Sequence, residues 1–171
     1  METSKYVFFY GHHQTASGHH VFSQWTACSF SDEDQNTYTS TEQYMMAQKA
    51  LLFDDQDYFD LIIKSNNPAQ IKKYGRMIRG FNERKWNRHK FNIVVQGNYL
   101  KFTQNVQFKH ILMLTGSKTI VEASPYDRIW GIGLDAKTAS KVPESSWPGE
   151  NLLGKALVEV RKLIAEDENK K

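Results

Sequence analysis

Residues 40–50 have the sequence STEQYMMAQKA, and we expect them to form the helix around which the rest of the chain is organised. At about 100° per residue, Glu42 and Lys49 fall on the same side of this helix as Met45 and Phe53. The two charges are two turns apart, about 10 Å along the axis, which is too far for an ordinary helical ion pair. A carboxylate and an amine are costly to bury on an apolar face without partners. One interpretation is therefore a pocket at this face.

The same stretch also permits a purely structural interpretation. Thr39-x-x-Glu42 and Ser40-x-x-Gln43 both fit a capping box, in which side chains satisfy the first backbone N–H groups of a helix. Lys49 could extend along apolar surface until its ammonium reaches water. The helix alone leaves both interpretations open.

The composition is that of a folded protein of one domain. The chain has 171 residues, of which 40% are hydrophobic and 13% aromatic, enough for a sizeable core. A single cysteine, Cys28, cannot form an internal disulfide and favours a reducing compartment. The apolar run at 6–10 is too short for a signal peptide, and no stretch approaches the roughly 18 apolar residues of a membrane span. We expect a cytoplasmic protein, or one of another reducing intracellular compartment, with no membrane contact and no stable protein partner.

Positive charge is concentrated in one segment. Residues 72–90 contain eight lysines and arginines and a single acid, Glu83, so this segment carries +7 in a chain whose net charge is +3. Such a local field suggests an anionic ligand at one place rather than contact along a polyanion. A solvated helix face would have the same composition, so that alternative stays open.

Apolar periodicity and chain breakers predict an α+β fold, a mostly helical single domain around a small β-sheet. Asn67-Pro68 is typical of a helix start and Gly80 of a helix end, whereas Gly97 argues against an unbroken helix over 83–104. Six helices are expected. The first four are 41–53, a short helix capped within 54–57 and ending at Ile63, 68–79, and 83–104, with a break near Asn105. The last two are a helix through 108–114 that stops at Gly116 and a helix capped by Asn151 that runs to 165. The expected strands are 6–10, 27–30 and 119–123. We expect 130–134 to be a loop or short strand and 135–148 to be irregular. The domain spans about 6–165, with 166–171 as a frayed tail.

Several familiar site motifs are missing from the sequence. The histidines include the adjacent pairs His12-His13 and His19-His20, but no His-x-x-x-His or Cys-x-x-Cys spacing that would suit a metal. Gly131-x-Gly133 lacks the third glycine of a dinucleotide fingerprint, and there is no P-loop. Cys28 is better explained as a small core residue than as a nucleophile. We therefore predict neither a metal nor a cofactor.

Two other groups of residues have the chemistry of a site. Glu122 and Asp127 flank the end of the 119–123 strand, although the Ser, Pro and Asp of this segment are also ordinary turn formers. Trp86 lies within the basic segment, where an aromatic ring can stack a planar base while cations hold phosphate. A core tryptophan is the alternative for Trp86.

Nine short motifs occur in an order that resembles the NADAR family, also called YbiA-like. The resemblance covers about residues 6–165, and the His-rich loop at 11–20 has no counterpart in it. The motifs are 22–25 FSQW, 41–50 TEQYMMAQKA, 73–76 KYGR, Trp86, 101–105 KFTQN, 115–116 TG, 121–127 VEASPYD, 130–134 WGIGL and 147–154 WPGENLLG.

The resemblance implies an enzyme, a hydrolase that breaks N-glycosidic bonds between ribose and a base. One branch of the family removes ADP-ribose from guanine in nucleic acid, and another is linked to intermediates of the riboflavin pathway. The basic segment favours the first branch, so we expect ADP-ribose or ADP-ribosylated guanine in DNA or RNA as the substrate. The alternatives are an N-glycosidase for phosphoribosyl-aminopyrimidines of the riboflavin type and a non-catalytic module that binds NAD or ADP-ribose.

The motif positions imply particular roles for six residues. A carboxylate can stabilise the positive charge that develops at C1′, activate water or protonate the departing base. A protonated lysine beside C1′ would oppose that charge, so the lysine is expected either to contact phosphate or, when neutral, to form a Schiff base with the opened ribose. By resemblance, the catalytic residues are Glu42, Lys49 and Asp127, and the substrate-binding residues are Trp86, Arg76 and Asn105.

Overall fold

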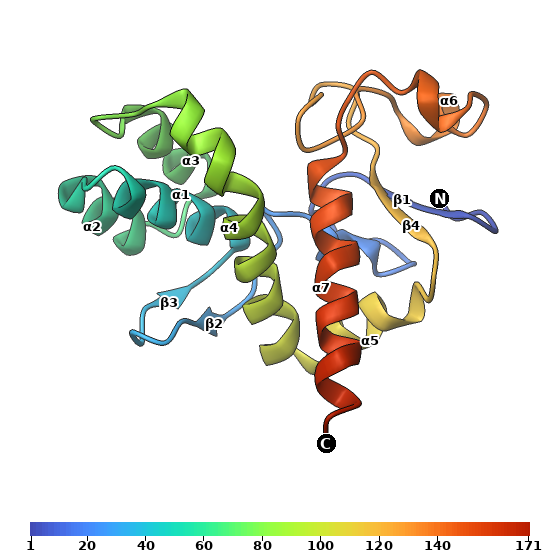
Figure 1. Cartoon of the computed structure of the whole chain (residues 1–171), viewed down its shortest axis with the longest axis horizontal. Helices are drawn as coiled ribbons and strands as arrows, with labels where there is room; N and C mark the ends of the chain where they lie inside the picture. The colour runs from blue at the N-terminus through green and yellow to red at the C-terminus, as the bar shows by residue number, and fades with distance from the viewer. The chain divides into compact units, whose positions relative to one another are not determined.

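A computed structural model describes residues 1–171, and the contacts within the chain divide it into two compact units (Figure 1). One unit contains residues 1–23 and 107–171, and the other contains residues 24–106. The chain has seven α-helices and four short strands, which confirms the prediction of a mostly helical α+β fold. The assignment of the whole chain to one domain stays a prediction. No helix combines the length and the apolar composition that crossing a membrane would require.

The unit of residues 24–106 is built around α1, Thr41–Leu52, as the sequence predicts. Helix α1 contacts the other three helices of this unit, which Figure 1 shows around it. Ser40 is its N-cap and accepts a hydrogen bond from Gln43 N (3.1 Å). Asn67 caps α3 as predicted, although α3 ends at Met77, two residues before the expected end. The three surrounding helices are α2 (Gln56–Lys64), α3 (Pro68–Met77) and α4 (Glu83–Gln104).

Two glycines allow the neighbouring helices to approach α1 closely. A Cβ on Gly75 of α3 would lie 2.0 Å from Met46 Sδ, and a Cβ on Gly97 of α4 would lie 2.5 Å from Tyr44 Cδ1. The predicted helix over 83–104 and its end near Asn105 are confirmed, and α4 runs without a break through Gly97, the residue that argued against an unbroken helix. The glycine makes room for the Tyr44 ring, and packing outweighs its low helix propensity.

A short hairpin replaces the strand that the sequence predicts at 27–30. Strand β2, Phe30–Ser31, pairs antiparallel with β3, Thr37–Tyr38. Asp32 closes the turn, because its carboxylate accepts hydrogen bonds from Asn36 N (2.9 Å) and from Tyr38 Oη (2.7 Å). With two residues in each strand, the hairpin has too few positions to show the alternation from which strands are predicted.

The unit of residues 1–23 and 107–171 contains a two-stranded parallel sheet. Strand β1, Tyr6–Phe9, pairs with β4, Thr119–Glu122, with Tyr6 opposite Thr119 and Phe9 opposite Glu122. The core beside this sheet includes Phe8, Val121 and Ile132. Helix α5 spans Val106–Leu114. Helix α7, Leu152–Glu168, contacts β4 and continues three residues beyond the predicted end, so the segment expected to fray is helical as far as Glu168.

The region from 135 to 148 is more regular than expected. It contains the short helix α6, Ala136–Ala139, and a 3-10 turn, η2, Glu144–Ser146. A second 3-10 turn, η1, spans His19–Phe22 and begins at the end of the segment predicted as a loop, 11–20. Asp135 caps α6 by accepting from Thr138 N (3.0 Å). These elements are one turn long, which is too short for a helical period to be visible in the sequence.

Asn151 precedes α7 as predicted, but its side chain does not cap the helix. Its backbone is left-handed (φ 54°), and its amide spans two backbone groups of β4. Oδ1 accepts from Glu122 N (3.0 Å), and Nδ2 donates to Ile120 O (3.0 Å). The first N–H groups of α7 instead donate to carbonyls of the 129–131 loop. Asn151 therefore attaches the start of α7 to the strand.

Candidate active site

Lys49 extends from the last turn of α1 into a half-buried position between a carbonyl and two aromatic rings. Its Nζ donates to Gly75 O over 2.7 Å, and it lies 4.7 Å from the ring centroid of Phe81 and 5.6 Å from that of Trp86. Burial lowers the pKa of Lys49, and the negative charge of Glu42 acts in the opposite direction. The amine therefore ends within a structured environment rather than simply reaching open water.

Glu42 lies two turns before Lys49 on α1 and is only 6% exposed. The Thr39–Glu42 capping box is not formed, because Thr39 N donates to Gln43 Oε1 (2.7 Å). The Glu42 backbone N–H donates a 3.0 Å hydrogen bond to Gln24 O, outside the helix. Helix capping therefore does not explain a carboxylate at this buried position.

Gln43 fixes the orientation of α1. Its Nε2 donates to three carbonyls at the C-terminal end of α2, those of Ile62 (3.0 Å), Ile63 (3.2 Å) and Ser65 (2.8 Å). Carbonyls at a helix end lack most of their intrahelical partners, so the amide serves as a cap, with Ile62 O also accepting from Ser65 N (3.2 Å). Because Gln43 is buried and follows Glu42 directly, this attachment also restricts where Glu42 can point.

Phe81 and Trp86 form the aromatic surroundings of the Lys49 amine. Trp86 is half-buried in the first turn of α4, and Phe81 precedes that helix and is 47% exposed. The Phe81 ring packs edge-on against Phe53, with centroids 5.3 Å apart. The sequence indicated Trp86 as a stacking surface but not Phe81 as a site residue. The available signal was a large apolar side chain beside a glycine in a strongly basic segment.

The basic segment divides into cations with structural partners and cations without them. The Arg79 guanidinium binds Asp55 (2.6 Å) and Asp57 (2.7 Å), and Lys85 Nζ donates to Leu52 O (3.0 Å). The hydrogen bond from Arg79 is the main cause that lowers the pKa of Asp55. Arg79 is thus part of the framework that holds α2 to α3. The exposed cations Lys73, Arg76, Arg84 and Arg88 remain for a ligand.

Arg76 and Asn105 do not contact the Lys49 amine as the Trp86 ring does. Arg76 follows Gly75 on α3, and its side chain is exposed. Asn105 ends α4, nineteen residues after Trp86, which is about 28 Å along the helix axis. Its Nδ2 donates to Lys101 O (2.8 Å) and Ser29 O (3.1 Å), so Asn105 holds the end of α4.

Asp127 belongs to the unit of residues 1–23 and 107–171 and organises the loop that follows β4. Its Oδ1 accepts from Ile129 N (2.8 Å) and Trp130 N (2.9 Å), and its backbone carbonyl accepts from Gly133 N (3.0 Å). Glu122 ends β4, where its backbone pairs with Asn151 and Ile132. The turn interpretation of this segment is therefore correct, and Asp127 keeps its second carboxylate oxygen for other contacts.

Lys101 is a buried titratable group that the sequence analysis did not identify. It is fully buried on the inner face of α4, and its Nζ lies 5.2 Å from the ring centroid of Phe102. Burial lowers the pKa of Lys101 to about 8. Its place in the sequence, four residues after Gly97 and seven after Val94, puts it on the buried stripe of α4 and was the signal available.

Comparison with known proteins shows the family of this chain, the NADAR domain family. The description of that family matches residues 8–165, and the chain belongs to it. The chain is 52% identical over 165 residues to N-glycosidase R617 of Acanthamoeba polyphaga mimivirus, with 94% of this chain and 97% of that protein covered. It is 33% identical to N-glycosidase Npun_R5314 of Nostoc punctiforme, with 76% and 77% covered.

A solved structure shares the fold. The NMR structure of the E. coli protein YbiA superposes with a TM-score of 0.79 and covers 100% of this chain and 91% of the other chain. The two sequences are 23% identical, so this likeness concerns the fold alone. The resemblance to the NADAR family inferred from nine motifs is confirmed.

Proposed function

We propose that this chain is an N-glycosidase that removes ADP-ribose from guanine bases in nucleic acid. Relatives that align over most of the chain are named N-glycosidases, which supports a hydrolase acting on N-glycosyl compounds. The observation that carries the proposal is the half-buried Lys49, whose pKa is lowered by burial and whose Nζ lies beside Trp86. A lysine whose amine becomes neutral more easily can act as a nucleophile.

The proposed chemistry is an exchange of amines at C1′ of the ribose. Opening of the ribose ring breaks the C1′–O4′ bond: the lone pair of the base nitrogen forms a C1′=N bond, and O4′ keeps the electron pair and takes a proton from Glu42. The neutral Nζ of Lys49 then adds to C1′ and returns a proton to Glu42. The C1′–N bond to the base breaks next, and its electron pair stays on the base nitrogen, which takes a proton from Glu42 acting as general acid. Water hydrolyses the resulting Schiff base, which releases ADP-ribose and restores the Lys49 amine.

The remaining residues are proposed to hold the substrate. Trp86 would stack a planar base, and Arg76 with the other exposed cations of the basic segment would bind the pyrophosphate. Asp127 is proposed as the second carboxylate that stabilises positive charge at C1′ through its Oδ2. Asn105 is proposed as a substrate contact through its Oδ1, since its Nδ2 already donates to two carbonyls.

Reductive trapping tests the role of Lys49. The protein is incubated with ADP-ribosylated guanine DNA and borohydride, and peptides are analysed by mass spectrometry. We expect an ADP-ribose adduct on Lys49 and loss of both adduct and turnover in Lys49→Ala. Lys49→Arg keeps the charge but cannot form the Schiff base, so an active Lys49→Arg variant would make the lysine a phosphate contact instead. Lys162→Ala, which changes an exposed lysine of α7, is the matched control.

A panel of substrates tests the rest of the proposal. Release of free ADP-ribose is measured on ADP-ribosylated guanine DNA and RNA, ADP-ribosylated protein and NAD, and base release on a pyrimidine ribosylamine phosphate. Turnover of only the last compound would assign the riboflavin-type activity, and binding without turnover of any would assign a non-catalytic module. Glu42→Gln is expected to slow turnover of the true substrate about a hundredfold if Glu42 is the acid.

A further inference from the structure

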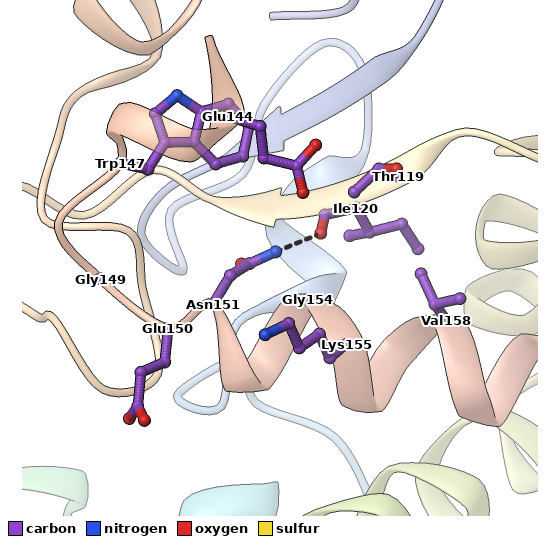
Figure 2. A pocket seen from close by; sticks show the side chains of 10 residues that line it. All are labelled: Thr119, Ile120, Glu144, Trp147, Gly149, Glu150, Asn151, Gly154, Lys155 and Val158. Atoms are coloured by element: carbon purple, nitrogen blue, oxygen red, sulfur yellow. Dashed lines mark hydrogen bonds between the residues drawn. The ribbon is translucent and has the colours of Figure 1, made fainter.

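The unit of residues 1–23 and 107–171 contains a cavity of its own between β4 and the start of α7 (Figure 2). Its volume is about 340 Å³, which lies within the range of small-ligand sites. None of the catalytic residues proposed above lines it. Half of its lining comes from the motif at 147–154, to which the proposed glycosidase chemistry assigns no role.

Backbone geometry explains only part of that motif. Gly149 N donates to Ile132 O (2.8 Å), and the Asn151 amide is occupied by β4. A Cβ on Gly154 would lie 2.1 Å from Ile120 O, so only glycine permits this approach of α7 to the strand. These contacts build the floor of the cavity but leave its aromatic and charged walls unexplained.

Trp147 provides a rigid aromatic wall. Its ring packs against Tyr6 and Phe8, with centroid distances of 5.2 Å and 6.0 Å, and its Nε1 donates to Ala139 O (3.3 Å). The indole is therefore held on one side and at its polar edge while it lines the cavity. A flat ring fixed in this way can stack a planar group at little entropic cost.

The charged groups of the cavity favour a cation. Glu144 and Glu150 line it together with one base, Lys155, whereas the whole chain carries a net charge of +3. Tyr6 Oη donates to Glu144 Oε2 (3.0 Å), which orients the carboxylate and leaves Oε1 to accept from a ligand. Figure 2 shows Glu144 and Trp147 on one side of the cavity and Lys155 and Val158 of α7 on the other.

We propose that this cavity binds a guanidinium group, stacked on Trp147 and paired with the Glu144 carboxylate. A guanidinium is planar, weakly hydrated and forked, so it can use an aromatic face and a carboxylate together, which a compact ammonium does less well. An anion would face the Glu144 carboxylate beside the ring, whereas the Glu150 carboxylate points away from it in Figure 2. The aliphatic stem of the ligand would lie along Val158 and Ile120. This binding does not depend on the proposed glycosidase function.

A titration followed by ¹H–¹⁵N NMR tests the proposal with three probes: agmatine, cadaverine and inorganic phosphate. We expect agmatine to give saturable shifts of the Trp147 indole N–H, assigned with Trp147→Phe, and of the Lys155 amide. Cadaverine has a similar stem with ammonium ends and should bind several-fold more weakly. No saturable shift with agmatine, or stronger shifts with phosphate, would overturn the proposal.

Two variants of the cavity and one matched control complete the test. Glu144→Gln can still accept from Tyr6 but loses its charge, and it should weaken agmatine binding about tenfold. Glu33→Gln changes an exposed acid in the other unit and should leave the affinity unchanged. Lys155→Gln removes a like charge and should tighten agmatine binding. Weaker binding in Lys155→Gln, or unchanged binding in Glu144→Gln with an intact spectrum, would contradict the assignment.

The source of the guanidinium is distinguished by comparing agmatine with a capped Gly-Arg-Gly peptide. Tighter binding of the peptide indicates an arginine side chain presented by a polypeptide, whereas binding of agmatine alone indicates a small free guanidine. Either result supports the site itself.

Discussion

The Lys49 ammonium donates a hydrogen bond to Gly75 O, which is one of the last carbonyls of α3. Such carbonyls carry the negative end of the helix dipole and favour a protonated partner, whereas burial favours the neutral amine. The net effect is a lowered pKa for Lys49. The amine is thus held in place by a contact that it would have to leave before the nucleophilic attack that we propose for it.

Competitive acetylation across a pH series should show that Lys49 becomes reactive at a lower pH than exposed Lys162, because a lowered pKa puts the neutral form at lower pH. Mass spectrometry of the labelled peptides gives the midpoint for each lysine. Glu42→Gln should lower the Lys49 midpoint further, because the Glu42 charge raises the pKa of Lys49. Glu33→Gln is the control and should leave it unchanged. Equal midpoints for Lys49 and Lys162 would contradict this description of the site.

Gln43→Leu should lower the free energy of unfolding by about 2–3 kcal/mol, because the carbonyls at the end of α2 lose their shared donor. The measurement is urea unfolding, with the dependence of the unfolding free energy on urea concentration fitted to one shared slope. Gln96→Leu, an exposed change on α4, is the matched control and should stay within about 0.5 kcal/mol of the parent. A Gln43→Leu variant as stable as its control would show that this amide does not hold α1 to α2.

Gly97→Ala should destabilise the protein by about 1–3 kcal/mol through overpacking, although alanine gains about 1 kcal/mol in helix propensity. The new Cβ would lie 2.5 Å from the ring of Tyr44, which is itself packed against Tyr38. In a Tyr44→Leu background the same substitution should cost less. Unfolding free energies of the four variants give this coupling, and a stabilising Gly97→Ala would exclude the close contact.

Lys101→Met should alter how stability depends on pH. In the folded protein the pKa of Lys101 is about 8, below the ordinary lysine value of 10.5. Between these two pH values the unfolded chain binds more protons than the folded chain, so stability rises with pH in that window. The parent should gain up to about 1.4 kcal/mol per pH unit relative to Lys101→Met between about pH 8 and pH 10. Urea unfolding of both proteins at matched pH measures the difference. Parallel curves would mean that Lys101 titrates normally.

Strong local signals allowed the sequence to predict the helices that contain the candidate site. The Ser40 cap placed the start of α1, and Asn67-Pro68 placed the start of α3, because both act through bonds within one turn. The hairpin around Asp32 and the short helix at Asp135 were missed, since they depend on side-chain contacts in turns and contain almost no periodic pattern.

The surroundings of Lys49 could be predicted only in part. Glu42 and Lys49 were recognised because they interrupt an apolar face of one helix, which is visible within a single element. The contact of Lys49 with Gly75 O joins residues 26 positions apart, and no pattern in either segment encodes it. Asn151 was expected to cap its own helix, but tertiary bonds to β4 replaced the local one.

The same Asn151 side chain has a consequence for self-association. A strand at the margin of a sheet exposes unpaired backbone groups on which a strand from another molecule can add. On the outward side of β4, Ile120 O and Glu122 N are bound by Asn151, and Glu122 O accepts from Ile132 N (3.0 Å). The side-chain amide of Asn151 thus pairs the backbone groups that a third strand would pair, and it adds no further unpaired strand. This margin of β4 is thereby closed to intermolecular extension, which protects it from edge-to-edge aggregation.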